Sequence, residues 1–174
     1  MSQVILQNKI QKDESTLISL ISRDITSITI PNGTTKIGDG AFNKCVVLTN
    51  VTIPNSVTLI YFAAFRGCSS LTSITIPSSV TNVGESAFSG CTKLVSVTVL
   101  ASSPPTLEPD AFYNTHTNLV IYVPAESVDT YKAASGWSYY AARIQAIPSW
   151  QSFLNGYNKS RIPQKRLVLM NDKN

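Results

Sequence analysis

The sequence is dominated by a segment that recurs every 23 residues. Three residue types mark this interval: Pro31, Pro54 and Pro77; Phe42, Phe65 and Phe88; Cys45, Cys68 and Cys91. Such a period indicates one supersecondary unit stacked on copies of itself, because a single unit cannot bury its own hydrophobic side. The chain is therefore expected to fold as a repeat solenoid.

The best-defined copy spans residues 71–93 and divides into three parts. Alternating apolar and polar residues over 73–76 predict a strand with one buried face, which ends at Pro77 because proline lacks a backbone N–H. A second short extended piece is expected over 80–83. Apolar residues then return at helical spacing over 87–94, which predicts a short helical turn.

The same frame lies over the two preceding copies, and a degraded fourth copy begins at Leu94. In this fourth copy the segment SSPPTLEP adds a residue, so that Phe112 follows Phe88 by 24 positions instead of 23. The sequence thus predicts about four coils, each with a strand and a short helical turn, which exceeds the roughly three that a solenoid needs for stability.

The copy LTSITIPSSVTNVGESAFSGC closely resembles the BspA-like leucine-rich repeat, a bacterial class with the same proline, Ala-Phe pair and Gly-Cys pair. The resemblance covers residues 25 to about 148. It includes the segment IYVPAESVDTYKAASGWSYYAARIQAI, which is similar to the terminal segment of such arrays in gut bacteria and their phages. The resemblance implies a curved or slightly twisted right-handed solenoid that serves in recognition or adhesion, without conserved catalytic residues.

The ends of the array are expected to carry caps. Apolar residues at helical spacing over 15–23 predict an N-terminal helical lid, and a helix over 125–134 is expected to follow Pro124 and stop near Gly136. Trp137, Tyr139, Tyr140 and Ile144 would then close the stack. The predicted division is an N-terminal cap over 1–24, repeats over 25–124, a C-terminal helical cap over 125–148 and a basic tail over 149–174.

The net charge of +4 lies entirely in the tail, which has five basic residues against one acidic, whereas residues 1–148 carry nine of each. A basic extension favours an acidic partner surface, and the tail residues of interest are Lys159, Arg161, Lys165 and Arg166. The alternative is a terminus without a partner. Nucleic-acid binding is disfavoured, since the repeat body, taken as residues 1–148, has no net charge.

Membrane insertion is not expected, because the apolar runs are far shorter than the ~20 residues of a spanning helix. No secretory signal is evident at the N-terminus either. The resemblance nevertheless implies an extracellular, cell-surface or virion location.

No cofactor, metal site or catalytic residue is predicted. The three cysteines lie one coil apart, so they are expected to form a buried ladder of free thiols, and no His or carboxylate recurs with them. His116 is the single histidine, in a polar loop, and no fixed spacing ties it to Ser102 or Asp110. An enzyme is therefore not expected.

Two surfaces are candidates for binding. A row of exposed side chains should cross the sheet, with further polar residues beside it: Thr29, Thr52, Thr75, Thr98, Tyr122, Asn50 and Ser73. β propensity alone also selects such residues for a solvated sheet face. Tyr61 and Phe62 stand where neighbouring copies have Gly and an acidic residue, which indicates either an interface anchor or local repacking.

The leading hypothesis is a non-enzymatic module that binds protein or glycan on a host or neighbouring surface through its sheet face. The alternative is a structural component of a phage virion or cell-surface assembly, homo- or hetero-oligomeric, that is anchored through its basic tail.

Overall fold

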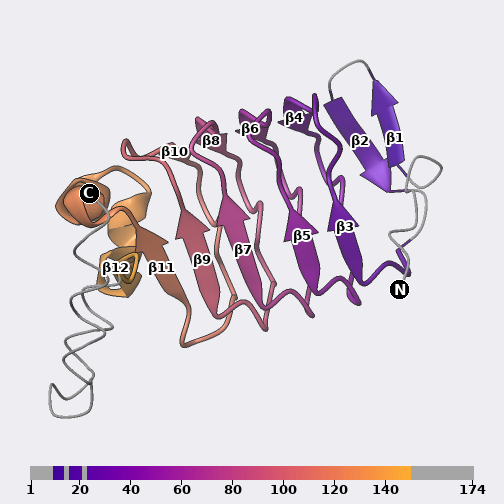
Figure 1. Cartoon of the computed structure of the whole chain (residues 1–174). Coiled ribbons are helices and arrows are strands. Elements are labelled where there is room, and N and C mark those ends of the chain that lie inside the picture. The colour runs from indigo at the N-terminus through magenta and orange to yellow at the C-terminus, as the bar shows by residue number, and fades with distance from the viewer. Residues whose placement is uncertain (1–9, 14–15, 21–22, 150–174) are drawn as a thin grey trace, which may run out of the picture.

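The computed structural model describes residues 10–13, 16–20 and 23–149 of the 174-residue chain. Figure 1 shows successive coils stacked side by side, with one strand of each coil facing the viewer and a shorter strand of the same coil behind it. The first described strands, β1 and β2, and the segment that contains β12 lie at opposite ends of the stack. This arrangement confirms the repeat solenoid that the 23-residue period predicts.

The longer strands form one side of the solenoid. They are β3 (Ser27–Thr29), β5 (Asn50–Thr52), β7 (Ser73–Ile76), β9 (Ser96–Val99) and β11 (Val120–Val123). Within β3–β5 and within β7–β9–β11, neighbouring strands pair in parallel, as Ile28 with Val51 and Ile74 with Val97 show. Alternate residues are buried, so each strand directs one row into the core and one row outward.

A second side is built from two-residue strands, namely β4 (Lys36–Ile37), β6 (Leu59–Ile60), β8 (Asn82–Val83) and β10 (Thr106–Leu107). They also pair in parallel, and β10 is the last strand of its sheet. The additional residue of the fourth copy is absorbed between β9 and β10, since Thr98 pairs with Thr75 but Thr106 pairs with Asn82.

The third side of the solenoid consists of turns. The prediction of a helical turn over 87–94 is wrong. Ser86 and Gly90 adopt positive φ angles of 55° and 74°, and the equivalent Ala63 and Gly67 do the same. These left-handed residues interrupt any helix. The backbone instead bonds to the next coil, as when Phe65 N donates to Ala87 O at 2.7 Å.

The core is a continuous column of equivalent side chains. Phe42, Phe65, Phe88 and Phe112 stack with ring centroids 4.8, 5.2 and 5.4 Å apart. All four rings are buried, and the cysteines are buried beside them. Offset-stacked aromatic pairs of this kind add roughly 0.5–1.5 kcal/mol each beyond their buried area.

The N-terminal cap is a β-hairpin, so the helix predicted over 15–23 is wrong. Strand β1 (Ile10–Asp13) pairs antiparallel with β2 (Thr16–Leu20), and β2 pairs in parallel with β4. The physical reason is the open edge of β4, whose backbone N–H and C=O groups a strand can satisfy and a helix cannot.

The C-terminal cap is shorter in helix than expected. It comprises a 3-10 turn η2 (Ala125–Ser127), a six-residue helix α1 (Val128–Ala133), a 3-10 segment η3 (Trp137–Arg143) and strand β12 (Ile144–Ala146), which pairs with β11. Trp137 and Ile144 are buried against the stack. Tyr139 is 91% exposed and takes no part in closing it.

Candidate functional site

The expected row of polar side chains lies on the outer face of the longer strands. Thr29 pairs with Thr52, Thr75 pairs with Thr98, and Thr98 pairs with Tyr122. The strands β5 and β7 are neighbours in Figure 1 but belong to separate hydrogen-bonded sheets. The structure therefore brings the row together as two in-register parts.

The exposure of this face decreases along the stack. Thr29, Thr52 and Thr75 are exposed, whereas Thr98 and Tyr122 are half-buried. Asn50 and Ser73 are exposed in the adjacent row, where Asn50 Nδ2 donates to Ser27 Oγ at 3.4 Å. The two rows offer neutral hydroxyl and amide groups that both donate and accept hydrogen bonds.

Tyr61 and Phe62 lie on the turn after β6, away from the polar row. The turn keeps the frame of its neighbours, because Tyr61 N donates to Ile37 O and Gly40 N donates to Phe62 O, both at 2.9 Å. Phe62 is 47% exposed. In the stack it occupies the position that the exposed carboxylates Asp39 and Glu85 occupy in the flanking coils. The other predicted interface residues, Lys159, Arg161, Lys165 and Arg166, lie outside the described residues.

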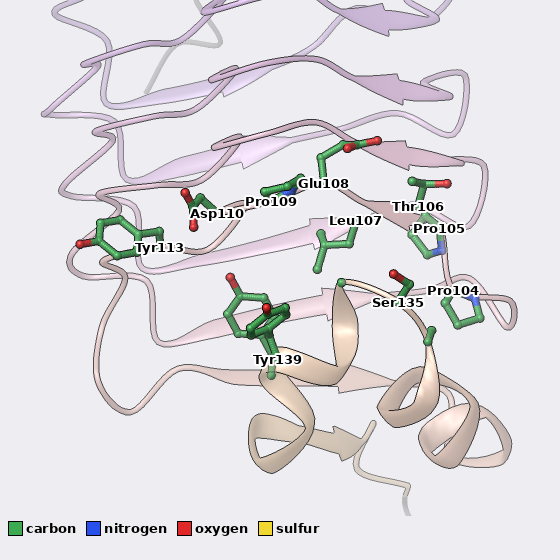
Figure 2. Close-up of a pocket in the computed structure, with 13 residues that line it drawn as sticks. Pro104, Pro105, Thr106, Leu107, Glu108, Pro109, Asp110, Tyr113, Ser135 and Tyr139 are labelled. Atoms are coloured by element: carbon green, nitrogen blue, oxygen red, sulfur yellow. The ribbon is translucent and has the colours of Figure 1, made fainter.

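A groove at the C-terminal end of the stack was not predicted. Figure 2 shows it between the segment that contains β10 and the cap, with Leu107 and Ser135 on its two sides. It has a volume of about 810 Å³, and its lining includes Glu108, Asp110 and Tyr113. The signal available in the sequence was the additional residue in SSPPTLEP, which alters this coil relative to its neighbours.

The cysteine ladder is placed as predicted, with Cys45, Cys68 and Cys91 buried and free. The Sγ atoms of Cys68 and Cys91 donate to backbone oxygens of Phe42 and Phe65 at 3.2 and 3.1 Å. Burial raises the pKa of the Cys45 thiol to about 11. The hydrogen bond to Cys91 and burial raise the pKa of Cys68 as well. Cys45 and Cys68 are therefore neutral near pH 7 and poor nucleophiles.

His116 has a structural hydrogen bond. Its Nδ1 accepts from Asn118 N at 3.0 Å, and its backbone oxygen accepts from Arg143 Nη1 at 3.4 Å. Across residues 23–149, no hydrogen bond joins His116 to Ser102 or Asp110. The part of the chain that the structure describes holds no cluster of three or more His, Cys, Asp or Glu side chains suited to a metal ion.

Among the described helices, none is long and apolar enough to cross a membrane.

Comparisons with known proteins place these features in a family. The sequence matches the BspA type leucine rich repeat region over residues 20–134, in six copies, which is more than the four or so coils expected. A leucine rich repeat protein of T. pallidum is similar over 71% of both chains, with 20% identity and a TM-score of 0.54. No curated protein matches the chain.

Two further solved structures resemble the chain over part of their length. A leucine-rich repeat protein from Eubacterium ventriosum is 27% identical over 65% of this chain and 30% of its own, with a TM-score of 0.52. One from Bacteroides ovatus is 24% identical over 72% of this chain and 37% of its own, with a TM-score of 0.53. The chain thus corresponds to about a third of each of these proteins.

Proposed function

The chain belongs to the BspA-type leucine-rich-repeat family, and on this premise we propose that it is a non-enzymatic recognition or adhesion module whose sheet face binds a protein or a glycan. Repeat regions of this type are interaction scaffolds, which supports a role in binding rather than in catalysis. The observation that carries the proposal is the polar row on the outer face of β3, β5, β7, β9 and β11, which is in register within β3–β5 and within β7–β9–β11.

The row is suited to a ligand because its geometry is fixed before binding. Each threonine lies on a strand whose neighbours set its position, and β-branching restricts its χ1 angle. Within each hydrogen-bonded part of the row, adjacent strands are roughly 4.8 Å apart, so the threonine hydroxyl groups recur at a regular interval. A glycan or an extended peptide backbone would form hydrogen bonds there with little ordering of the protein. We place this activity on an extracellular, cell-surface or virion protein.

A second candidate function follows from the charge distribution. The basic residues of the tail, which hold the whole net charge, would anchor the chain to a neighbouring subunit of a virion or surface assembly while the solenoid projects. In this case the sheet face would carry no ligand.

Binding of the full chain to a glycan array and to cell-surface proteins tests the first candidate. Thr75→Lys places a long charged side chain at the centre of the face and should reduce binding at least about tenfold, since a buried unpaired charge opposes association. Thr92→Lys is the matched control, because Thr92 is also exposed but lies outside the strand rows. Its binding should equal that of the wild type.

The tail is tested in the same assay with Gln in place of Lys159, Arg161, Lys165 and Arg166. Binding that survives this change but is lost in Thr75→Lys supports recognition through the sheet face. Binding that is lost with the tail charges and retained in Thr75→Lys would favour the anchoring function and exclude the sheet face.

A further inference from the structure

The groove at the end of the stack exists because β10 has no following strand. In the inner coils, backbone groups of each coil bond to the next, as Ala63 N does to Glu85 O and Ser86 N to Pro109 O. Asp110 occupies the same position one coil later. Within residues 23–149, its N–H forms no hydrogen bond. This exposed N–H is therefore a donor at the wall of the groove that a ligand could use.

The cap supplies only part of what a further coil would supply. Trp137 Nε1 donates to Pro105 O at 2.7 Å, and Tyr140 Oη accepts from Phe112 N at 3.4 Å. These aromatic side chains thus replace a donor and an acceptor of the absent coil. The backbone of Gly136 packs against Leu107 O and covers this part of β10. Glu108, Pro109 and Asp110 line the groove beyond it (Figure 2) without an equivalent cover.

The charge of the groove is one-sided. Glu108 and Asp110 line it, and its lining contains no Lys, Arg or His. Neither carboxylate forms an ion pair with a described residue, and Glu108 only accepts a 3.5 Å hydrogen bond from Asn82. Two exposed aromatic side chains, Tyr113 at 64% and Tyr139 at 91%, add ring faces that attract cations. The groove is suited to an extended peptide with basic side chains.

The chain itself carries such a peptide. The segment KSRIPQKR over residues 159–166 has four basic residues among eight, and the repeat body offers no comparable positive segment. The described chain ends at Ser149, three residues after β12 of the same cap that forms one wall of the groove. Ten further residues reach up to roughly 33–36 Å when extended, which gives residues 159–166 a long reach from Ser149.

We propose that residues 159–166 bind in this groove of their own chain, with basic side chains against Glu108 and Asp110 and backbone carbonyls toward Asp110 N. Attachment in the same molecule gives the segment an effective concentration on the order of millimolar, so modest contacts suffice. This inference is independent of any ligand on the sheet face. It also means that an anchoring tail must leave the groove before it can bind a neighbour.

Limited trypsin digestion of the full chain tests the proposal. The rate of cleavage after Lys159, Arg161, Lys165 and Arg166 is measured by mass spectrometry. We expect the double variant Glu108→Gln/Asp110→Asn to be cleaved about tenfold faster than the wild type, because cleavage follows the population of the open form. Asn tolerates the left-handed backbone at position 110, where φ is 56°, so the turn is retained.

The matched control is Glu126→Gln/Asp129→Asn, which removes two exposed carboxylates of the cap that do not line the groove. Its cleavage rate should equal that of the wild type, whereas 1 M salt should accelerate cleavage of the wild type by screening. Equal cleavage of the wild type and the groove variant, with unchanged melting temperatures, would overturn the proposal.

Photo-crosslinking distinguishes the tail of the same chain from that of another copy. With p-benzoylphenylalanine in place of Tyr139, crosslinks to tail peptides within one chain are expected at all protein concentrations. Crosslinked dimers whose yield rises with concentration would show an exchange between copies and overturn the intramolecular arrangement. Crosslinks that exclude the tail would overturn the proposal altogether.

Discussion

At the scale of single residues, each position of the repeat is determined by its equivalents one coil away. Thr34 illustrates this, because Val57 and Val80 occupy the same position in the next two coils. All three residues are buried, and the backbone N–H of each donates to the carbonyl oxygen of the proline three residues earlier. The Thr34 Oγ1 is buried without a hydrogen-bond partner. An orphaned hydroxyl of this kind costs roughly 1–3 kcal/mol.

We therefore expect Thr34→Val to raise the free energy of unfolding by about 1 kcal/mol, because valine keeps the shape and removes the unpaired hydroxyl. Urea denaturation measures this. Thr58→Val is the matched control, since the exposed Thr58 Oγ1 donates to Thr35 O at 3.1 Å, and its stability should stay the same or fall slightly. A loss of stability in Thr34→Val would mean that this hydroxyl is bonded in solution.

At the scale of elements, the sequence predicted the strands better than the segments between them. The alternation over 73–76 is read correctly because burial on one face leaves a period of two. The segment over 87–94 was misread, since inward side chains at helical spacing are equally compatible with stacked turns that contain left-handed residues. The hairpin strand β2 was misread for a related reason, because its conformation is determined by the edge of β4 and not by its own apolar spacing.

The turn after β8 allows a test at this scale. A Cβ at Gly84 would lie 2.6 Å from Tyr61 C and 2.8 Å from Phe62 N, so the backbone of the preceding coil leaves no room for one. We expect Gly84→Ala to lower the free energy of unfolding by about 2–3 kcal/mol, as measured by guanidinium denaturation.

The comparison for this variant is Gly33→Ala. Gly33 has a φ of 83° but nothing within 4 Å of its added Cβ, so only the left-handed penalty of about 1–2 kcal/mol applies. If Gly84→Ala were no more destabilising than Gly33→Ala, the close approach of the two coils would not limit the residue at position 84.

At the scale of the whole molecule, each end coil of the solenoid lacks one neighbouring coil, so another segment of the chain must cover it. The period predicts the stack, and the aromatic residues after Gly136 predict that its C-terminal end is closed. Which of them close it depends on three-dimensional contacts: Trp137 is buried, whereas Tyr139 lies in solvent. The additional residue in SSPPTLEP indicates that this coil differs from its neighbours, but the groove beside Tyr139 depends on how the cap packs against the last coil, which the sequence pattern does not determine. The candidate face was predictable, since it follows from strand register alone.

Closure of the C-terminal end by Trp137 leads to a prediction about how the stack unfolds. Trp137→Phe removes the donor to Pro105 O and part of a buried ring, so we expect a loss of about 2–3 kcal/mol. Because each coil contacts chiefly its neighbours, unfolding of the variant should begin at the C-terminal end of the stack. Hydrogen exchange should show reduced amide protection over residues 94–124 before residues 25–53. Tyr139→Phe, at a solvent-exposed position of the same segment, should change neither region. A uniform loss of protection in Trp137→Phe would contradict this prediction and show that the coils unfold as one cooperative unit.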